Sequence, residues 1–388
     1  MIYFDNAATT VNKPKEVIKE TVNSIKNHGN PGRGGYSLSL NAAQKIFNTR
    51  LSAAGIFGSN SPERVVFTAN ATMSLNIAIK CFARQNSHII ISCFEHNSVY
   101  RPVEKLKNDQ NFNISYDIFD ISLDDNAETI KNAVNLIKEN TGMIIITHVS
   151  NVCGKILPVG DIIKKAKEKN PNIIAVVDAA QSAGTLDIDI CRDKIDILCV
   201  PAHKGLMGIC GLGVMIFGDD FDKFDTETAE HTTFIEGGTG INSLETKMPR
   251  DLPERFEAGT PNTPAIAALS ASLDYIAKES VQKIYHHEKI LYNRAIDILK
   301  NLKKVNLYSD FTSKDYIGAV LFNINGYKCE EIARILNREQ IFIRDGYHCS
   351  PLAHKKLGTI NTGAIRISFG YYNTLKELDK FYGVIKKL

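Results

Sequence analysis

Two polar side chains at the ends of consecutive apolar segments could act together on one aromatic cofactor. The segment 172–177 reads Asn-Ile-Ile-Ala-Val-Val and runs into Asp178, and the segment 195–200 reads Ile-Asp-Ile-Leu-Cys-Val and runs into Pro-Ala-His-Lys204. A lysine amine can form a Schiff base, and a carboxylate can keep a pyridine nitrogen protonated so that the ring withdraws electrons from the substrate Cα. Either residue alone could be an ordinary polar strand end, but together they suggest pyridoxal 5'-phosphate.

The apolar segments around these residues predict the element that brings them together. Short continuous apolar runs are typical of parallel strands that are covered on both faces. A third run, 211–217, follows a glycine-rich turn. In open α/β sheets the ligand site lies at the carboxyl ends of the strands. Asp178 and Lys204 are both predicted to lie there.

An alternation of strand and helix patterns over about 64–217 predicts an α/β fold with a mainly parallel, seven-stranded sheet. Residues 219–263 lose this rhythm, and Pro264 opens a long helical pattern that reaches about Lys303. We therefore predict a large domain that ends near residue 263 and a second, α+β domain over 264–388. The strands expected in the smaller domain lie near 305–309, 317–324, 340–344 and 364–369, and its further helices near 328–338 and 374–387.

The composition and charge of the chain argue against several functional classes. The chain has 388 residues and a formal net charge of +3, which argues against nucleic acid or a membrane surface as a partner. No apolar run approaches transmembrane length. The eight cysteines form no C-x-x-C pair and no metal-ligand spacing, so we expect reduced thiols, a cytoplasmic location and no metal site. A dinucleotide-binding fingerprint is missing, because the glycines of 208–213 precede a strand instead of following one.

The segment around Lys204 resembles a known family. Ile195-Asp-Ile-Leu-Cys-Val-Pro-Ala-His-Lys204, with Gly211 and Gly213 after it, is similar to the lysine motif of class V aminotransferase-like pyridoxal phosphate enzymes. Within that class the chain looks most like cysteine desulfurases and selenocysteine lyases, from Tyr3-Phe-Asp-Asn-Ala-Ala to Tyr372-Asn-Thr. The resemblance implies fold type I, with a large domain over 15–263 and a small domain that combines 1–14 with 264–388. It also implies a homodimer, L-cysteine or L-selenocysteine as the substrate and a protein that accepts the sulfur.

The same resemblance implies roles for individual residues. Lys204 forms the Schiff base, Asp178 pairs with the pyridine nitrogen, and Arg366 clamps the substrate carboxylate, a bidentate task that suits guanidinium. The other implied contacts are Gln181 with the ring hydroxyl, His96 stacked on the ring, Asn151 near the ring and the substrate carboxylate, Ala71, Thr72 and His203 with the phosphate, and Thr260 with the phosphate in the partner subunit.

Two positions depart from the family pattern around the phosphate. Family members usually have Ser or Thr two residues before the histidine of the His-Lys pair, and here that residue would be Pro201, which has neither a hydroxyl nor an N–H. Some members carry two threonines in the phosphate turn, whereas this chain has Ala71 and Thr72. We therefore expect weaker phosphate binding than is normal for the family, or support from elsewhere in the fold.

The position of Cys349 favours one of the reactions that class V enzymes catalyse. It follows Tyr347-His348 in a loop after the predicted strand 340–344, where the family's desulfurases carry their nucleophilic cysteine. A loop cysteine beside histidine can be partly ionised, which nucleophilic attack requires. The chain is thus expected to convert L-cysteine to L-alanine, with Lys204 removing the Cα proton, His96 handling protons at the substrate thiol and a persulfide remaining on Cys349.

Alternatives remain at this point. Selenocysteine lyase activity is one, and another class V activity, such as that of an aminotransferase, a kynureninase-like hydrolase or an epimerase, is a second. A non-catalytic sulfur-relay or assembly partner is a third. His348 could be the base for Cys349 or a residue that packs the loop, and packing is favoured. Four other histidines are expected to be solvated, namely His231, His286, His287 and His354, and the remaining seven cysteines are expected to be core or incidental.

Overall fold

The computed structural model describes residues 1–32, 34–224, 233–309 and 315–388. A seven-stranded sheet forms its centre, with the strand order β2-β8-β7-β6-β5-β3-β4. β8 is antiparallel to both of its neighbours, and the other adjacent pairs are parallel. The predicted mainly parallel, seven-stranded sheet is therefore confirmed. The strands are β2 (Val65–Thr68), β3 (His88–Ser92), β4 (Ser115–Phe119), β5 (Thr141–Thr147), β6 (Ile174–Asp178), β7 (Ile197–Pro201) and β8 (Gly213–Phe217).

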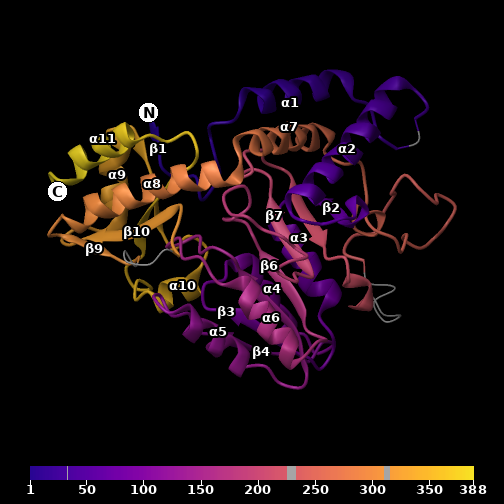
Figure 1. Ribbon diagram of the computed structural model, residues 1–388, viewed down its shortest axis with the longest axis horizontal. Coiled ribbons are helices and arrows are strands. Elements are labelled where there is room, and N and C mark those ends of the chain that lie inside the picture. The colour runs from indigo at the N-terminus through magenta and orange to yellow at the C-terminus, as the bar shows by residue number, and fades with distance from the viewer. Residues whose placement is uncertain (33, 225–232, 310–314) are drawn as a thin grey trace.

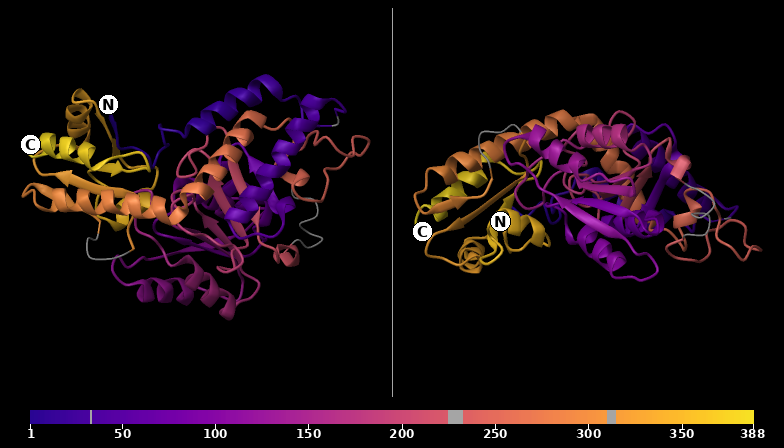
Figure 2. Two further views of the ribbon diagram at one scale, coloured as in Figure 1. Left: turned by 45° about the horizontal axis from the view of Figure 1, so that its top comes forward. Right: turned by 90° about the horizontal axis from the view of Figure 1, so that it is seen from below.

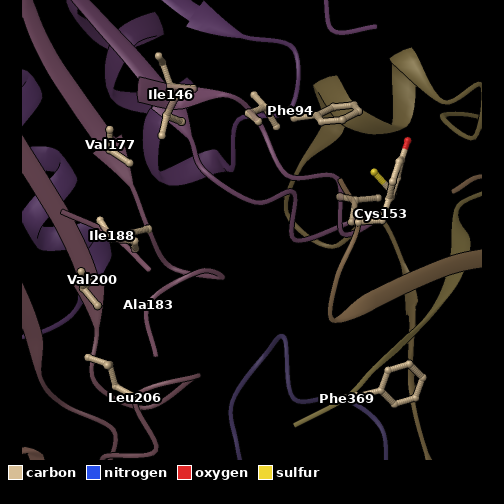
Figure 3. Close-up of a cluster of buried hydrophobic side chains, with 14 of the residues drawn as sticks. Phe94, Ile146, Cys153, Val177, Ala183, Ile188, Val200, Leu206 and Phe369 are labelled. Carbon is tan, nitrogen blue, oxygen red and sulfur yellow. The ribbon is translucent and has the colours of Figure 1, made fainter. Parts of the chain in front are cut away.

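Both faces of this sheet are covered, which is why its strands read as continuous apolar runs. Alternate residues of β5 belong to different cores: Ile144 and Ile146 to one, Met143 and Ile145 to the other. Figure 3 shows Ile146 with Val177 and Val200 of the adjoining strands β6 and β7 in the first core. The helices of this part of the chain are α1 (Lys15–Asn27), α2 (Ser37–Ile56), α3 (Ala71–Phe82), α4 (Asn97–Lys107), α5 (Asn126–Asn135) and α6 (Val159–Lys169), with 3-10 helices η1 (Pro62–Arg64), η2 (Phe221–Phe224) and η3 (Glu254–Phe256).

The chain after residue 300 builds a smaller α+β unit. Its four-stranded antiparallel sheet has the order β12-β13-β10-β9, and β1 from the N-terminus pairs with β11. The termini therefore meet in this unit, as Figures 1 and 2 show. Its elements are β1 (Ile2–Tyr3), β9 (Val305–Leu307), β10 (Ala319–Ile324), α9 (Cys329–Arg338), β11 (Ile341–Phe342), β12 (Arg344–Gly346), α10 (Pro351–Lys356), β13 (Ala364–Ser368) and α11 (Leu375–Ile385).

The long helical pattern after Pro264 is two helices, so the single helix predicted there is wrong. The helices α7 (Thr263–Glu279) and α8 (Val281–Lys300) are separated by Ser280, whose φ of 71° is left-handed. The Ser280 hydroxyl accepts from Lys283 N and so caps α8. α7 packs against α1 and α2, whereas α8 contacts β9, β10 and α11. The division into domains at residue 263 stays a prediction.

One glycine lets the antiparallel strand β8 approach the start of α3. A Cβ on Gly213 would lie 2.4 Å from the carbonyl carbon of Asn70 and 2.5 Å from Thr68 Oγ1, so no larger residue fits. Asn70 is the N-cap of α3, and its side chain accepts from Met73 N. This contact fixes the N-terminus of α3 beside the carboxyl ends of the strands.

A helix long and apolar enough to cross a bilayer is not found in the described part of the chain.

Candidate active site

The carboxyl ends of β6 and β7 bring Asp178 and Lys204 to one cavity of about 90 Å³. Asp178 is the last residue of β6 and is 3% exposed, and Lys204 lies three residues beyond the end of β7. Most of the residues predicted for cofactor binding also line this cavity: Ala71, Thr72, His96, Asn151, Gln181 and His203, together with Pro201. Cys349, Arg366 and Thr260 are not part of its lining.

The charges of the central pair are set by burial. Burial lowers the pKa of the Lys204 amine to about 8, and the Arg366 and Arg344 charges lower it further, while Asp178 opposes the shift. An amine with this pKa is partly neutral near neutral pH, which both Schiff-base formation and proton removal require. Burial raises the pKa of Asp178 from its ordinary value.

Asp178 has the free hydrogen-bonding capacity that a protonated ring nitrogen needs. Its Oδ1 accepts from Ala180 N at 2.9 Å. Within the described ranges, no donor is hydrogen-bonded to its other oxygen. A buried carboxylate with an open acceptor at a cavity fits the pyridinium of pyridoxal phosphate. Gln181, which was predicted for the ring hydroxyl, donates its Nε2 to the carbonyl of Ala7 and still lines the cavity.

The N-terminus of α3 forms the predicted phosphate end of the cavity. Ala71 and Thr72 are the first two residues of this helix, so their backbone N–H groups have no partner within it. Such a helix end attracts an anion through its N–H groups and its dipole. His203 also faces the cavity, with Nδ1 2.9 Å from Thr9 Oγ1, and burial lowers its pKa to about 4. The residues present therefore fit a phosphate group, although Pro201 offers no hydroxyl.

His96 is neutral and its tautomer is defined. Burial, followed by the positive charges of Lys204 and Arg344, lowers its pKa to about 4. Its Nδ1 accepts from the backbone N–H of Ser98 at 3.1 Å, so the proton of the neutral ring sits on Nε2. His96 is the N-cap of α4, and this capping bond fixes the ring at the edge of the cavity.

Arg366 in β13 is buried, with 1% of its surface exposed. Its Nη2 donates to Asp5 Oδ1 at 2.6 Å, and its Nη1 donates to the carbonyl of Asn151 at 2.7 Å. Nε is buried and, within the described residues, has no hydrogen-bond partner. The guanidinium thus has a free N–H beside Asn151, which lines the cavity. Its role as the clamp for the substrate carboxylate stays a prediction.

Cys349 lies in the short connection between β12 and α10. Its side chain is exposed, and Arg344 Nη2 lies 3.7 Å from its Sγ. His348 is buried with its ring stacked on His354 at 5.3 Å, its Nδ1 pairs with His354 Nε2, and its Nε2 faces the carbonyl of Arg344. Burial lowers the pKa of His348 to about 2. These contacts agree with the packing interpretation of His348.

For the other histidines and cysteines, the structure can be compared with the predicted burial or solvation of each side chain. His354 is fully buried, so its predicted solvation is wrong; its Nδ1 is hydrogen-bonded to Thr359 Oγ1, which fastens the loop. His286 is exposed, His287 is half-buried, and His231 lies outside the described residues. Five of the other cysteines are buried, namely Cys81, Cys93, Cys153, Cys199 and Cys329, and burial raises the pKa of each.

Sequence reasoning assigned no role to three residues that lie at the site. Arg344 is the cation beside Cys349, and Asp5 is the partner of Arg366. Glu95 is buried next to His96, its Oε1 accepts from Ser92 Oγ and Thr147 N, and burial raises its pKa to about 8. Asp5 stands in the stretch Tyr3-Phe-Asp-Asn-Ala-Ala, which carries part of the family resemblance, but only tertiary contacts reveal what Asp5 and Glu95 touch. Thr260 lies in a separate groove with residues of α2, and its contact with a partner subunit stays a prediction.

Comparisons with known proteins agree with this geometry. The family model described as Aminotransferase class-V matches residues 2–381. A probable cysteine desulfurase of Pyrococcus abyssi is 33% identical over 100% of this chain and 94% of its own length, and a cysteine desulfurase of Haloferax volcanii is 29% identical over 99% and 88%. The apo structure of a cysteine desulfurase from Thermococcus onnurineus NA1 superimposes with a TM-score of 0.91 at 32% identity, covering 100% of this chain and 94% of that one. The cysteine desulfurase CsdA of Escherichia coli shares the fold, with a TM-score of 0.85 at 22% identity, over 99% and 94%.

Proposed function

The chain belongs to the aminotransferase class-V family, and we propose that it is a pyridoxal-phosphate-dependent cysteine desulfurase that converts L-cysteine to L-alanine. One observation carries the proposal: the Lys204 and Asp178 side chains line one cavity, and a loop with an exposed cysteine and a neighbouring arginine is fastened to a residue of that cavity. The fold and the activity also agree with the relatives named above.

The cofactor supplies an electron sink when bound, because its protonated ring withdraws electrons from the substrate Cα. Asp178 would hold the ring nitrogen through its open oxygen, and the N-terminus of α3 would hold the phosphate. Lys204 would hold the aldehyde carbon before the substrate enters. All these groups belong to strand or helix ends, so the sheet itself fixes their spacing.

Lys204 and His96 divide the proton chemistry. A Lys204 amine with a pKa of about 8 is neutral often enough near pH 7 to remove the Cα proton. His96 is neutral with its proton on Nε2, so it can donate a hydrogen bond from Nε2 to a group of the substrate. Lys204 therefore provides a base at Cα, and His96 provides a hydrogen-bond donor that lines the same cavity.

Cys349 receives the sulfur. Its Sγ attacks the substrate sulfur, a sulfur–sulfur bond forms, and the substrate bond between Cβ and sulfur breaks. Cβ gains a proton and leaves as the methyl group of alanine, while the transferred sulfur stays on Cys349 as a persulfide. The step needs no outside oxidant, since the two electrons that the two sulfur atoms lose are the two that reduce Cβ. The Arg344 guanidinium lies 3.7 Å from this sulfur and so places a positive charge beside it during the attack.

The homodimer and the sulfur acceptor are part of this proposal. The exposed faces of α1 and α2 carry an unusual number of large apolar side chains, which suits an interface with a second copy of the chain. They are Ile18, Val22, Ile25, Leu38, Leu40, Phe47 and Leu51. Thr260 lies in a groove that borders α2, so this interface would bring it close to a partner subunit. The exposed position of Cys349 suits transfer of the sulfur to a second protein.

Alanine release tests the proposal. The wild-type protein, loaded with pyridoxal phosphate, is expected to release alanine from L-cysteine. Cys349→Ala should lose sulfur transfer while still binding the cofactor, and Lys204→Ala should lose both. Cys191→Ala, which removes another exposed thiol, is the matched control and should behave as the wild type. Full alanine and sulfide production by Cys349→Ala would contradict the role of this cysteine.

A further inference from the structure

Ser350 follows the proposed nucleophile and contacts a residue of the Lys204 cavity. It is completely buried, and its hydroxyl donates to Asn151 Oδ1 at 2.8 Å. The Nδ2 of the same amide donates to the carbonyl oxygen of His348 at 2.7 Å. A carbonyl oxygen can only accept, so this contact fixes which end of the Asn151 amide carries the nitrogen. One planar amide therefore holds the residues on both sides of Cys349.

The backbone of Asn151 is fixed as well. Its carbonyl oxygen accepts from Arg366 Nη1 at 2.7 Å. The hydroxyl of the preceding residue, Ser150, accepts from Val152 N and Cys153 N, which closes the turn at the end of β5. Asn151 thus links the buried arginine, the cavity and the loop that carries Cys349. Because each of these links is a hydrogen bond to a buried group, a displacement of one hydrogen-bonded group should also displace the others.

The loop itself needs such support. His348 and Cys349 have φ values of 51° and 58°, the left-handed region that residues other than glycine rarely occupy. A backbone of this kind persists only where the surrounding structure holds it. Two asparagines hold its backbone carbonyls: Asn151 donates to the carbonyl of His348, and the backbone N–H of Asn97 donates to the carbonyl of Cys349 at 2.8 Å.

We propose that Ser350 is a positioning residue for the desulfurase reaction. By donating to Oδ1 it orients the Asn151 amide, so that one N–H holds the carbonyl of His348 and the second N–H is available for the substrate carboxylate beside Arg366. The amide then sets the distance between the bound substrate and the Cys349 sulfur. This inference rests on the proposed function, because it assumes that the carboxylate binds at Arg366 and that Cys349 attacks.

The test uses Ser350→Ala and the rescue variant Ser350→Thr, which keeps a hydroxyl. Ser24→Ala is the matched control, since Ser24 is a buried serine on α1 whose hydroxyl is hydrogen-bonded to His28. In the loaded protein, rapid quenching and mass spectrometry give the rate of persulfide formation on Cys349, and the change in visible absorbance on adding L-cysteine gives the rate of substrate entry. In the cofactor-free protein, hydrogen exchange is measured for the peptide 345–353.

We expect Ser350→Ala to slow persulfide formation about tenfold, the size of one lost hydrogen bond, while substrate entry is unchanged. Exchange in 345–353 should rise, and Ser350→Thr should restore both. Combined with Asn151→Ala, Ser350→Ala should cause no further loss, because it acts through that amide. Wild-type rates and wild-type exchange in Ser350→Ala would overturn the proposal, and so would a further tenfold loss in the double variant.

Two further outcomes are informative. Asn151→Asp keeps the bond from Ser350 but removes the donor to His348, so exchange in 345–353 should rise even where Ser350→Ala fails to fold. Unchanged exchange in Asn151→Asp would refute the proposed restraint. If the wild-type protein formed no persulfide, the proposed function would fail, whereas the exchange experiment would still decide whether Ser350 and Asn151 hold the loop.

Discussion

The lowered pKa of Lys204 makes a quantitative prediction about cofactor uptake. Only the neutral amine attacks an aldehyde, so the rate at which cofactor-free protein takes up pyridoxal phosphate follows the neutral fraction of Lys204. With a pKa of about 8, about one amine in ten is neutral at pH 7. An ordinary lysine, with a pKa near 10.5, is neutral in only about one molecule in 3,000 at that pH. The fold therefore raises the reactive fraction about 300-fold.

The assay is rapid mixing of the cofactor-free protein with pyridoxal phosphate, followed by the absorbance of the Schiff base from pH 6 to pH 10. The rate should rise about tenfold per pH unit at first and level off above about pH 8. Parallel reactions with a simple alkyl amine correct for titration of the cofactor itself, and Lys204→Ala should give no signal. A rate that keeps rising to pH 10 would refute the reasoning that burial controls this amine.

Charged neighbours should shift the pH at which the uptake rate levels off, in a direction set by the sign of their charge. Two other features of the fold give independent tests. Arg344→Gln should raise the pKa of Lys204, because a nearby positive charge is removed, whereas Asp178→Asn should lower it. Burial raises the pKa of Glu288 in the folded protein to about 8, so the wild type should lose stability as the pH rises from about 4.5 to about 8. The Glu288→Gln variant should not lose stability over this pH range. At pH 8, urea unfolding should give a free energy of unfolding that differs from that of the wild type by a few kcal/mol. Asp297→Asn, on the exposed face of α8, should show no such difference. Extended dialysis should remove part of the cofactor because Pro201 and Ala71 offer no hydroxyl to the phosphate, and full retention of the Schiff-base absorbance would contradict this.

The sheet and the central pair could be predicted because their signals are local. Continuous apolar runs mark buried parallel strands, and the residue that follows each run lies at the carboxyl edge, so the sequence alone is enough to expect Asp178 and Lys204 together. The split between α7 and α8 was missed because the apolar periodicity continues across Ser280, and only its left-handed backbone breaks the helix.

Contacts between distant segments could not be predicted in the same way. His354 looks like a surface residue in sequence, yet its ring packs against His348 in the turn of a short helix and is fully buried. Asp5 and Arg366 are separated by almost the whole chain and meet because the N-terminal segment pairs with the end of β13, where Ser368 N–H donates to the carbonyl of Phe4. The hydrogen bonds between Asn151 and the Cys349 loop likewise depend on how the smaller sheet docks near the end of β5.

The most direct test of the central claim is mass spectrometry of the loaded protein after brief incubation with L-cysteine. We expect one added sulfur atom on the peptide that contains Cys349, removable by a thiol reductant, together with an equal amount of alanine. Finding the added sulfur on another cysteine, or alanine without any sulfur on the protein, would contradict it.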